Sequence, residues 1–136
     1  MTISAVSTST LTIYRKEVFA NMNKSEIREV LVNLRKYDFH VKVFQSHRKI
    51  YNAVGMSDLL IIDNKYGRCI FVEIKAGKDK QRKEQIELMN YVNECRGLGI
   101  MYILATENNV NEIHRLIAIK DYYNLKLLTE EKGKKP

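Results

Sequence analysis

Two apolar runs of strand length, joined by a short turn, constrain the fold more than any other feature of this chain. The first run, "LLIID", covers residues 59–63, and the second, "RCIFVEIK", covers 68–75. The intervening "NKYG" contains Asn and Gly, which favour turns. The runs therefore predict an antiparallel hairpin, and its strands are apolar enough to lie in a sheet that helices cover on both faces.

Three charged residues lie at positions of these strands that should be buried. With a four-residue loop, Asp63 pairs with Arg68, and stepping back along both strands places Asp58 opposite Glu73. Lys75 follows two residues later and points to the same face. A shift of one residue in the register would separate the two acids, so their convergence depends on the length of the turn.

The two facing carboxylates predict a metal site. Neighbouring carboxylates repel each other unless a divalent cation lies between them, and Mg²⁺ takes its oxygen ligands from one or two carboxylates, water and substrate phosphate. The alternative is that Asp58 caps a strand while Glu73 and Lys75 form an exposed ion pair. Glu73 lies within the apolar "CIFVEI", where an unpaired acid is costly to bury, and this favours the metal site.

The rest of the chain predicts one α/β domain with a mixed central sheet flanked by helices. The expected elements beside the hairpin are a helix at 23–37, a strand at 39–44, a helix at 82–96, a strand at 100–106 and a helix at 110–118. The strand, helix and strand over 68–106 form a right-handed crossover, so the last strand runs parallel to the second strand of the hairpin. We expect residues 1–22 to form an arm, 23–128 the domain and 129–136 a charged, solvated tail.

The charge balance points to a polyanion as the partner. The chain has 136 residues, 23 Lys and Arg against 16 Asp and Glu, a formal net charge of +7 and a pI near 9.4.

No apolar run approaches the roughly 20 residues of a membrane-spanning helix, and the first residues do not have the pattern of a secretory signal. Cys69 and Cys95 are expected to be buried thiols of a reducing compartment. We therefore expect a cytoplasmic protein that does not bind membranes.

The charged positions of the hairpin resemble the signature of a known family. "GMSDLLI" followed by "FVEIKAG" resembles the PD-(D/E)XK nucleases, in which an Asp heads one core strand and a Glu-x-Lys ends the next. Ser57 stands where the motif begins with Pro. The arrangement "SDLLI…EIKAGKDKQRKEQ…GLGIMYIL" most resembles the compact VRR-NUC nucleases and then the archaeal-type Holliday junction resolvases.

The resemblance implies a restriction-endonuclease-like core over about 24–106 and a function. It implies a Mg²⁺-dependent DNA endonuclease, with Mn²⁺ as a substitute, that hydrolyses phosphodiesters in branched or otherwise structured DNA. Asp58 and Glu73 would be metal ligands, the backbone carbonyl of Ile74 a third ligand, and Lys75 the residue that positions the attacking water.

Two helical residues are further candidates, because the family often adds an acid from the first helix and a Gln from the helix after the Glu-x-Lys strand. Glu26 lies about 85° from the centre of the apolar stripe at 100° per residue. It can reach the edge of the core as a ligand, or it can stabilise the N-terminus of its helix. Gln85 lies in line with Met89 and Val92 on the apolar face, where a polar side chain needs a partner, and we expect that partner to be the site.

DNA contacts and assembly are further expectations. The residues expected to contact DNA are His47, Arg48, Lys49, Lys78, Lys80 and Arg82. Two symmetric cuts need two sites, so we expect a homodimer, and a partner protein could deliver the substrate. The alternatives are a catalytically inactive DNA-binding module of the same fold, in a repair or replication complex, and a small enzyme that acts on a phosphorylated metabolite.

Overall fold

A computed structural model describes residues 22–44, 57–78 and 80–133, with side chains up to residue 129. The elements within them, in chain order, are α2 (Lys24–Val32), the 3₁₀ helix η1 (Asn33–Lys36), β1 (His40–Val43), β2 (Leu59–Asp63), β3 (Arg68–Ile74), α3 (Lys83–Asn93), β4 (Ile100–Ala105), α4 (Val110–Ala118) and α5 (Tyr122–Gly133). The four strands form one sheet in the order β1-β2-β3-β4. β2 is antiparallel to both neighbours, and β3 is parallel to β4.

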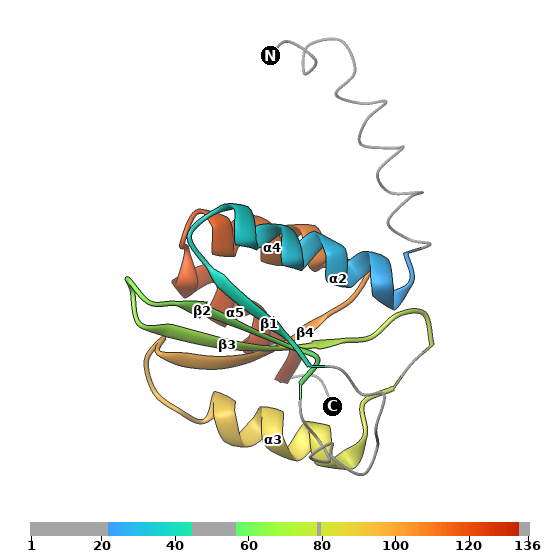
Figure 1. The fold of residues 1–136 in the computed structure, drawn as a ribbon. Coiled ribbons are helices and arrows are strands. Elements are labelled where there is room, and N and C mark those ends of the chain that lie inside the picture. Colours follow the sequence, from blue (N-terminus) through green and yellow to red (C-terminus); the bar gives the residue numbers. More distant parts are fainter. Residues whose placement is uncertain (1–21, 45–56, 79, 134–136) are drawn as a thin grey trace, which may run out of the picture.

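The helices form two layers around the sheet (Figure 1). The figure shows α2 and α4 over one face and α3 over the other, and α5 packs against α4 and the outer strand β4. The predicted α/β class, with a mixed sheet between helices, is therefore confirmed. The predicted hairpin register is also confirmed, since Asp63 pairs with Arg68.

The two faces of the sheet differ in how completely they are covered. Strand residues facing α2 and α4 are fully or almost fully buried and include Leu59, Ile61, Ile70, Val72, Met101 and Ile103. Their neighbours along the strands alternate to the other face, and Leu60, Phe71 and Leu104 there are only partly buried. Among the helices that the structure describes, α3 is the one that lies over that face.

A buried ionic cluster holds the hairpin turn against the helices. Asp63 is fully buried, and its carboxylate accepts hydrogen bonds from the backbone N–H groups of Lys65 and Tyr66. Its Oδ2 accepts from Lys120 Nζ at 2.8 Å and from the Tyr122 hydroxyl at 2.6 Å. Burial alone would raise the pKa of Asp63, but the hydrogen bonds from Lys120, Tyr122 and Tyr66 outweigh it and lower the pKa to about 2. The cluster links β2 to the connection between α4 and α5.

Both outer strands have backbone groups that are covered by side chains. On β4, the amide of Asn93 exchanges two hydrogen bonds with the backbone of Tyr102, at 2.9 and 3.0 Å. Asn109 donates to the carbonyl of Leu104 on the same strand. On β1, the guanidinium of Arg35 donates to the carbonyl of Val41. These contacts occupy edge groups that could otherwise pair with a strand of another chain.

The C-terminal helix α5 is the element that the sequence analysis did not anticipate. Its buried positions are Tyr122, Leu125, Lys126 and Thr129, a spacing of i, i+3, i+4 and i+7. Two of the four are polar, so the apolar stripe is incomplete in the sequence. The helix continues to Gly133, into the segment that we expected to be a solvated tail.

The expectation of two buried thiols is wrong for Cys95. α3 ends at Asn93, shorter than the predicted helix, and Cys95 lies exposed just beyond it. Cys69 is partly buried in β3, and both cysteines are free thiols. Among the helices that the structure describes, none combines the length and the apolar character that crossing a membrane requires.

Candidate active site

The charged residues of the hairpin lie at the end of the sheet where β3 and β4 finish and β2 begins. The chain leaves β3 at Lys75 and turns at Gly77, whose positive φ of 59° favours glycine. From there it runs to the start of α3. Asp58, Glu73 and Lys75 therefore belong to one edge of the sheet, beside the helix that covers its more open face (Figure 1).

Asp58 is fixed by the backbone at the head of β2. Regular pairing ends at Leu59 and Val72, and the N–H of Asp58 then donates to the carbonyl of Val72 at 2.9 Å. The carboxylate reaches further along β3, and its Oδ2 accepts the backbone N–H of Ile74 at 2.7 Å. No other donor among the described residues reaches the Asp58 carboxylate, so its Oδ1 is left for a ligand.

Ser57 contributes to the conformation of the chain where it enters β2. Its side chain is 3% exposed, and its hydroxyl donates to the carbonyl of Leu59 at 3.0 Å. The bond spans Asp58, where the chain bends.

Glu73 is fully buried, and its two carboxylate oxygens have different surroundings. Oε1 accepts hydrogen bonds from Gln81 Nε2 at 2.8 Å and from the Tyr102 hydroxyl at 3.2 Å. Oε2 accepts no hydrogen bond from the described residues, although Lys75 Nζ lies 3.3 Å away as an ion pair. A buried carboxylate oxygen that has an ion pair but no hydrogen-bond donor among the described residues is a candidate metal ligand.

The carboxylate of Glu73 also affects the pKa of the Tyr102 phenol. Burial raises the pKa of the Tyr102 phenol, the charge and hydrogen bond of Glu73 raise it further, and the charge of Asp58 adds to the effect. The carboxylates of Asp58 and Glu73 thus both disfavour ionisation of the Tyr102 phenol.

These residues fit a divalent cation in part. Among the described residues, Asp58 Oδ1 accepts no hydrogen bond and Glu73 Oε2 has only the Lys75 ammonium beside it, and both are hard ligands of the kind that Mg²⁺ prefers. In a strand, the N–H and C=O of one residue face the same side. The carbonyl of Ile74 therefore lies on the side of Asp58, to which its N–H donates. No group of three His, Cys, Asp or Glu side chains converges within the described residues, so water or substrate would complete the coordination.

Gln81 and Tyr102 are site residues that the sequence analysis missed. A tyrosine inside the apolar "IMYILA" was a signal, but the sequence predicted only that its strand is parallel to the strand of Glu73, and the observed register places the two on one face. The role of Gln81 was harder to predict, because "AGKDKQRK" has the composition of a solvated loop. Its position six residues after Lys75 becomes informative only once α3 packs against the sheet.

The two predicted helical residues lie at helix N-termini instead. Glu26 Oε1 accepts the backbone N–H of Asn23, and Asn23 Oδ1 accepts that of Glu26, which forms a capping box. Gln85 Oε1 accepts the backbone N–H of Arg82 at the start of α3. The structure does not bring either side chain into contact with Asp58 or Glu73, and their catalytic roles stay predictions.

The predicted DNA-binding residues fall into two groups. Lys78, Lys80 and Arg82 lie exposed between β3 and α3, and none forms an ion pair with another described residue. His47, Arg48 and Lys49 lie outside the described residues.

Helix orientation adds positive potential at the same edge. α3 and α4 begin just after β3 and β4 end, and α2 runs in the same direction, as Figure 1 shows. Three helices therefore direct their N-termini, each with a partial positive charge, toward the edge where the carboxylates lie.

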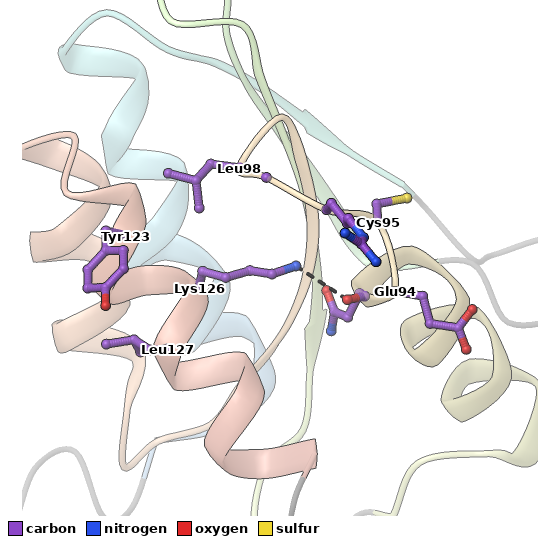
Figure 2. Close-up of a pocket in the computed structure, with 9 residues that line it drawn as sticks. Glu94, Cys95, Leu98, Tyr123, Lys126 and Leu127 are labelled. Atoms are coloured by element: carbon purple, nitrogen blue, oxygen red, sulfur yellow. Dashed lines mark hydrogen bonds between the residues drawn. The ribbon is translucent and has the colours of Figure 1, made fainter.

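A separate hollow lies at the other end of α3. Its volume is about 440 Å³, and its lining includes Cys95, Leu98, Tyr123 and Lys126 (Figure 2). Lys126 extends from α5 toward the last turn of α3, where its Nζ donates to the carbonyl of Asn93 at 3.5 Å. A cation at the carbonyl end of a helix stabilises that helix, which accounts for this buried lysine.

Comparisons with known proteins add little to this geometry. No family model matches the sequence, and no curated protein matches it. A solved structure described as a VRR_NUC domain is similar to 66% of this chain and to 91% of its own length, with 18% identity and a TM-score of 0.49. A likeness this weak does not decide the family, so the interpretation of the site rests on its own residues.

Proposed function

We propose that this domain is a metal-dependent DNA endonuclease that hydrolyses phosphodiesters in branched or structured DNA. The observation that carries the proposal is the convergence of Asp58, Glu73 and Lys75 at one edge of the sheet. In the part of the chain that the structure describes, each carboxylate has one oxygen that accepts hydrogen bonds and one that accepts none. A lysine beside two such carboxylates suits the hydrolysis of a phosphate ester.

The roles of the residues follow from their positions. Asp58 Oδ1, Glu73 Oε2 and the carbonyl of Ile74 would hold Mg²⁺ or Mn²⁺. The bound metal would polarise the phosphate and lower the pKa of a coordinated water. Lys75 Nζ would orient the attacking water and stabilise the negative charge that develops on the phosphate oxygens. Water adds across the P–O bond, and the leaving oxygen takes up a proton.

The surroundings of the site suit a polyanionic substrate. Lys75, Lys78, Lys80, Arg82 and Lys83 fall within a segment of nine residues that leads from β3 into α3. Phosphate contacts from such residues supply affinity without sequence preference. The helix N-termini at the same edge add to this field.

The direct test is cleavage of a panel of labelled DNAs. Single strands, duplexes, flaps, replication forks and four-way junctions would be incubated with Mg²⁺ or Mn²⁺, and with EDTA as the control. We expect metal-dependent cleavage that is strongest on a branched substrate and absent in EDTA. Binding without cleavage of any substrate, under either metal, would refute the endonuclease assignment.

A second candidate is a DNA-binding module that has the same fold and no activity. The observation that favours it is that no group of three His, Cys, Asp or Glu side chains converges within the described residues. It predicts salt-dependent DNA binding that neither metal nor EDTA changes. The substrate panel therefore separates the two candidates.

The active form would be a C2 dimer, because symmetric cuts in both strands of a DNA need two sites. Side chains cover backbone groups on both outer strands, so the dimer would not form by extending the sheet across two subunits.

A further inference from the structure

The two oxygens of Glu73 are treated differently by the protein. Oε1 has two donors, Gln81 Nε2 at 2.8 Å and the Tyr102 hydroxyl at 3.2 Å. Oε2 has no hydrogen-bond donor among the described residues, and the ammonium of Lys75 lies 3.3 Å from it. A buried carboxylate that is held at one oxygen by neutral donors cannot rotate freely about its last torsion.

The ring and the backbone of Tyr102 are each held in place by a neighbouring residue. Tyr102 pairs with Phe71 in the neighbouring strand, and the two rings stack with centroids 6.2 Å apart. The side-chain amide of Asn93 clamps the backbone of Tyr102 from the outer edge of the sheet. Because Glu73 pairs with Leu104, two residues further along β4, Tyr102 and Glu73 share one face of the sheet. Backbone and ring are thus both fixed before the hydroxyl meets Glu73.

Gln81 reaches the same oxygen from the segment before α3. Its Nε2 also lies 3.7 Å from Met89 Sδ on that helix, and its side chain is partly buried. The chemistry fixes the orientation of the amide, since an ionised carboxylate accepts and only the Nε2 group can donate. The placement of Gln81 therefore depends on how α3 packs over the sheet.

We propose that Gln81 and Tyr102 are positioning residues that hold Oε1 of Glu73 and so present Oε2 to the metal. Both donors are neutral, so they orient the carboxylate without replacing the charge that a cation would supply. The inference rests on the proposed metal site but concerns residues for which the motif supplies no role. Partners that orient a ligating carboxylate typically change metal affinity or activity by about 10- to 100-fold when removed.

Metal binding without DNA tests the proposal, with free Mn²⁺ followed by electron paramagnetic resonance. Tyr102→Phe and Gln81→Met each remove one donor while nearly keeping the shape of the side chain. We expect each change to raise the Kd for Mn²⁺ by about 10-fold. Tyr91→Phe, at a tyrosine that is 73% exposed, is the matched control and should bind Mn²⁺ like the wild type. Thermal unfolding of every variant establishes that it is folded.

A double-mutant cycle separates positioning from a general effect on the fold. In a Glu73→Gln background, Tyr102→Phe and Gln81→Met should have no further effect on the residual binding of Mn²⁺. At saturating Mn²⁺, the kcat for a branched DNA should recover toward the wild-type value in both single variants. A structural defect would not be rescued by metal in this way.

The outcomes distinguish the positioning roles from the proposed function. If Glu73→Gln loses Mn²⁺ while Tyr102→Phe and Gln81→Met bind as tightly as the wild type, the positioning roles are refuted and the metal site stands. If Gln85→Met weakens binding more than Gln81→Met, the wrong glutamine has been assigned. If the wild type binds Mn²⁺ with the expected losses in the variants but cleaves no DNA, the positioning roles stand and the nuclease function falls. Unchanged binding in Glu73→Gln overturns both.

Discussion

The Oδ2 of Asp58 lies 2.7 Å from the backbone nitrogen of Ile74, whose N–H it accepts. This bond joins Asp58, at the head of β2, to Ile74, the last residue of β3. Because Glu73 directly precedes Ile74, the bond sets the carboxylate of Asp58 beside Glu73. It also fixes which oxygen of Asp58 is free. The hairpin itself therefore aligns the two acids.

Neutralising either acid should separate cleavage from binding. Asp58→Asn and Glu73→Gln each remove a ligand charge and leave the basic segment intact. We expect Mg²⁺-dependent cleavage of a branched DNA to disappear, while DNA affinity at moderate salt is kept or rises. Asp38→Asn, at an exposed residue paired with Lys65, is the control and should cleave normally. Metal-dependent cleavage by both Asp58→Asn and Glu73→Gln would remove the basis for the site.

Lys75 should act on the rate rather than on the affinity. Its side chain is 13% exposed and lies against Glu73, unlike the exposed Lys78. We expect Lys75→Ala to lower the single-turnover rate by about two orders of magnitude or more, with little change in Kd, because it stabilises charge in the transition state. Lys78→Ala should instead weaken binding and flatten its salt dependence, with a normal rate at saturating DNA. The reverse pattern would place Lys75 in the DNA-binding surface.

Glu26 offers a test between a helix cap and a metal ligand. The capping box with Asn23 predicts that Glu26→Ala lowers the free energy of unfolding by about 0.5–1 kcal/mol. Glu26→Gln keeps the capping group and removes the charge, so it should unfold like the wild type in urea. Both variants should bind Mn²⁺ normally. Weaker Mn²⁺ binding in Glu26→Gln would show that the charge of Glu26 serves the metal.

Because Asp63 is buried, the free energy of unfolding should change with pH in the acid range. Its pKa falls from an ordinary value of 3.8 to about 2 in the folded protein, which corresponds to about 2.4 kcal/mol at 1.36 kcal/mol per pH unit. A lowered carboxyl pKa stabilises the fold above pH 3.8, and the contribution is lost as the pH falls toward 2. We expect Asp63→Asn to lower the free energy of unfolding by about 2–3 kcal/mol at pH 7, and the difference to shrink below pH 4.

Urea unfolding followed by circular dichroism between pH 7 and pH 2 measures this effect. The exposed Asp38 supplies the control, because surface ion pairs contribute about 0–1 kcal/mol. A constant difference between Asp63→Asn and the wild type over the whole range would mean that packing, and not the ionised pair with Lys120, supplies the stability.

The sequence by itself determined the hairpin and the place of its charged residues. A four-residue turn between two apolar runs leaves one register that buries both, and that register pairs Asp63 with Arg68 as predicted. The same local logic predicted α4 at Val110–Ala118, where apolar residues repeat with helical spacing. Turn chemistry and periodicity act over a few neighbouring residues, so a sequence reveals them directly.

Tertiary packing decided which residues surround the acids. Gln81 reaches Glu73, while Gln85 turns to the backbone at the start of α3, and the choice depends on how that helix sits over the sheet. Tyr102 meets Glu73 from the neighbouring strand, although the two residues are 29 positions apart in the sequence. The helix α5 was not predicted for a related reason. Lys126 and Thr129 are buried by the neighbouring elements and not because of their own hydrophobicity. Burial and hydrogen-bond partners of this kind arise only when distant segments pack together, and no local pattern encodes them.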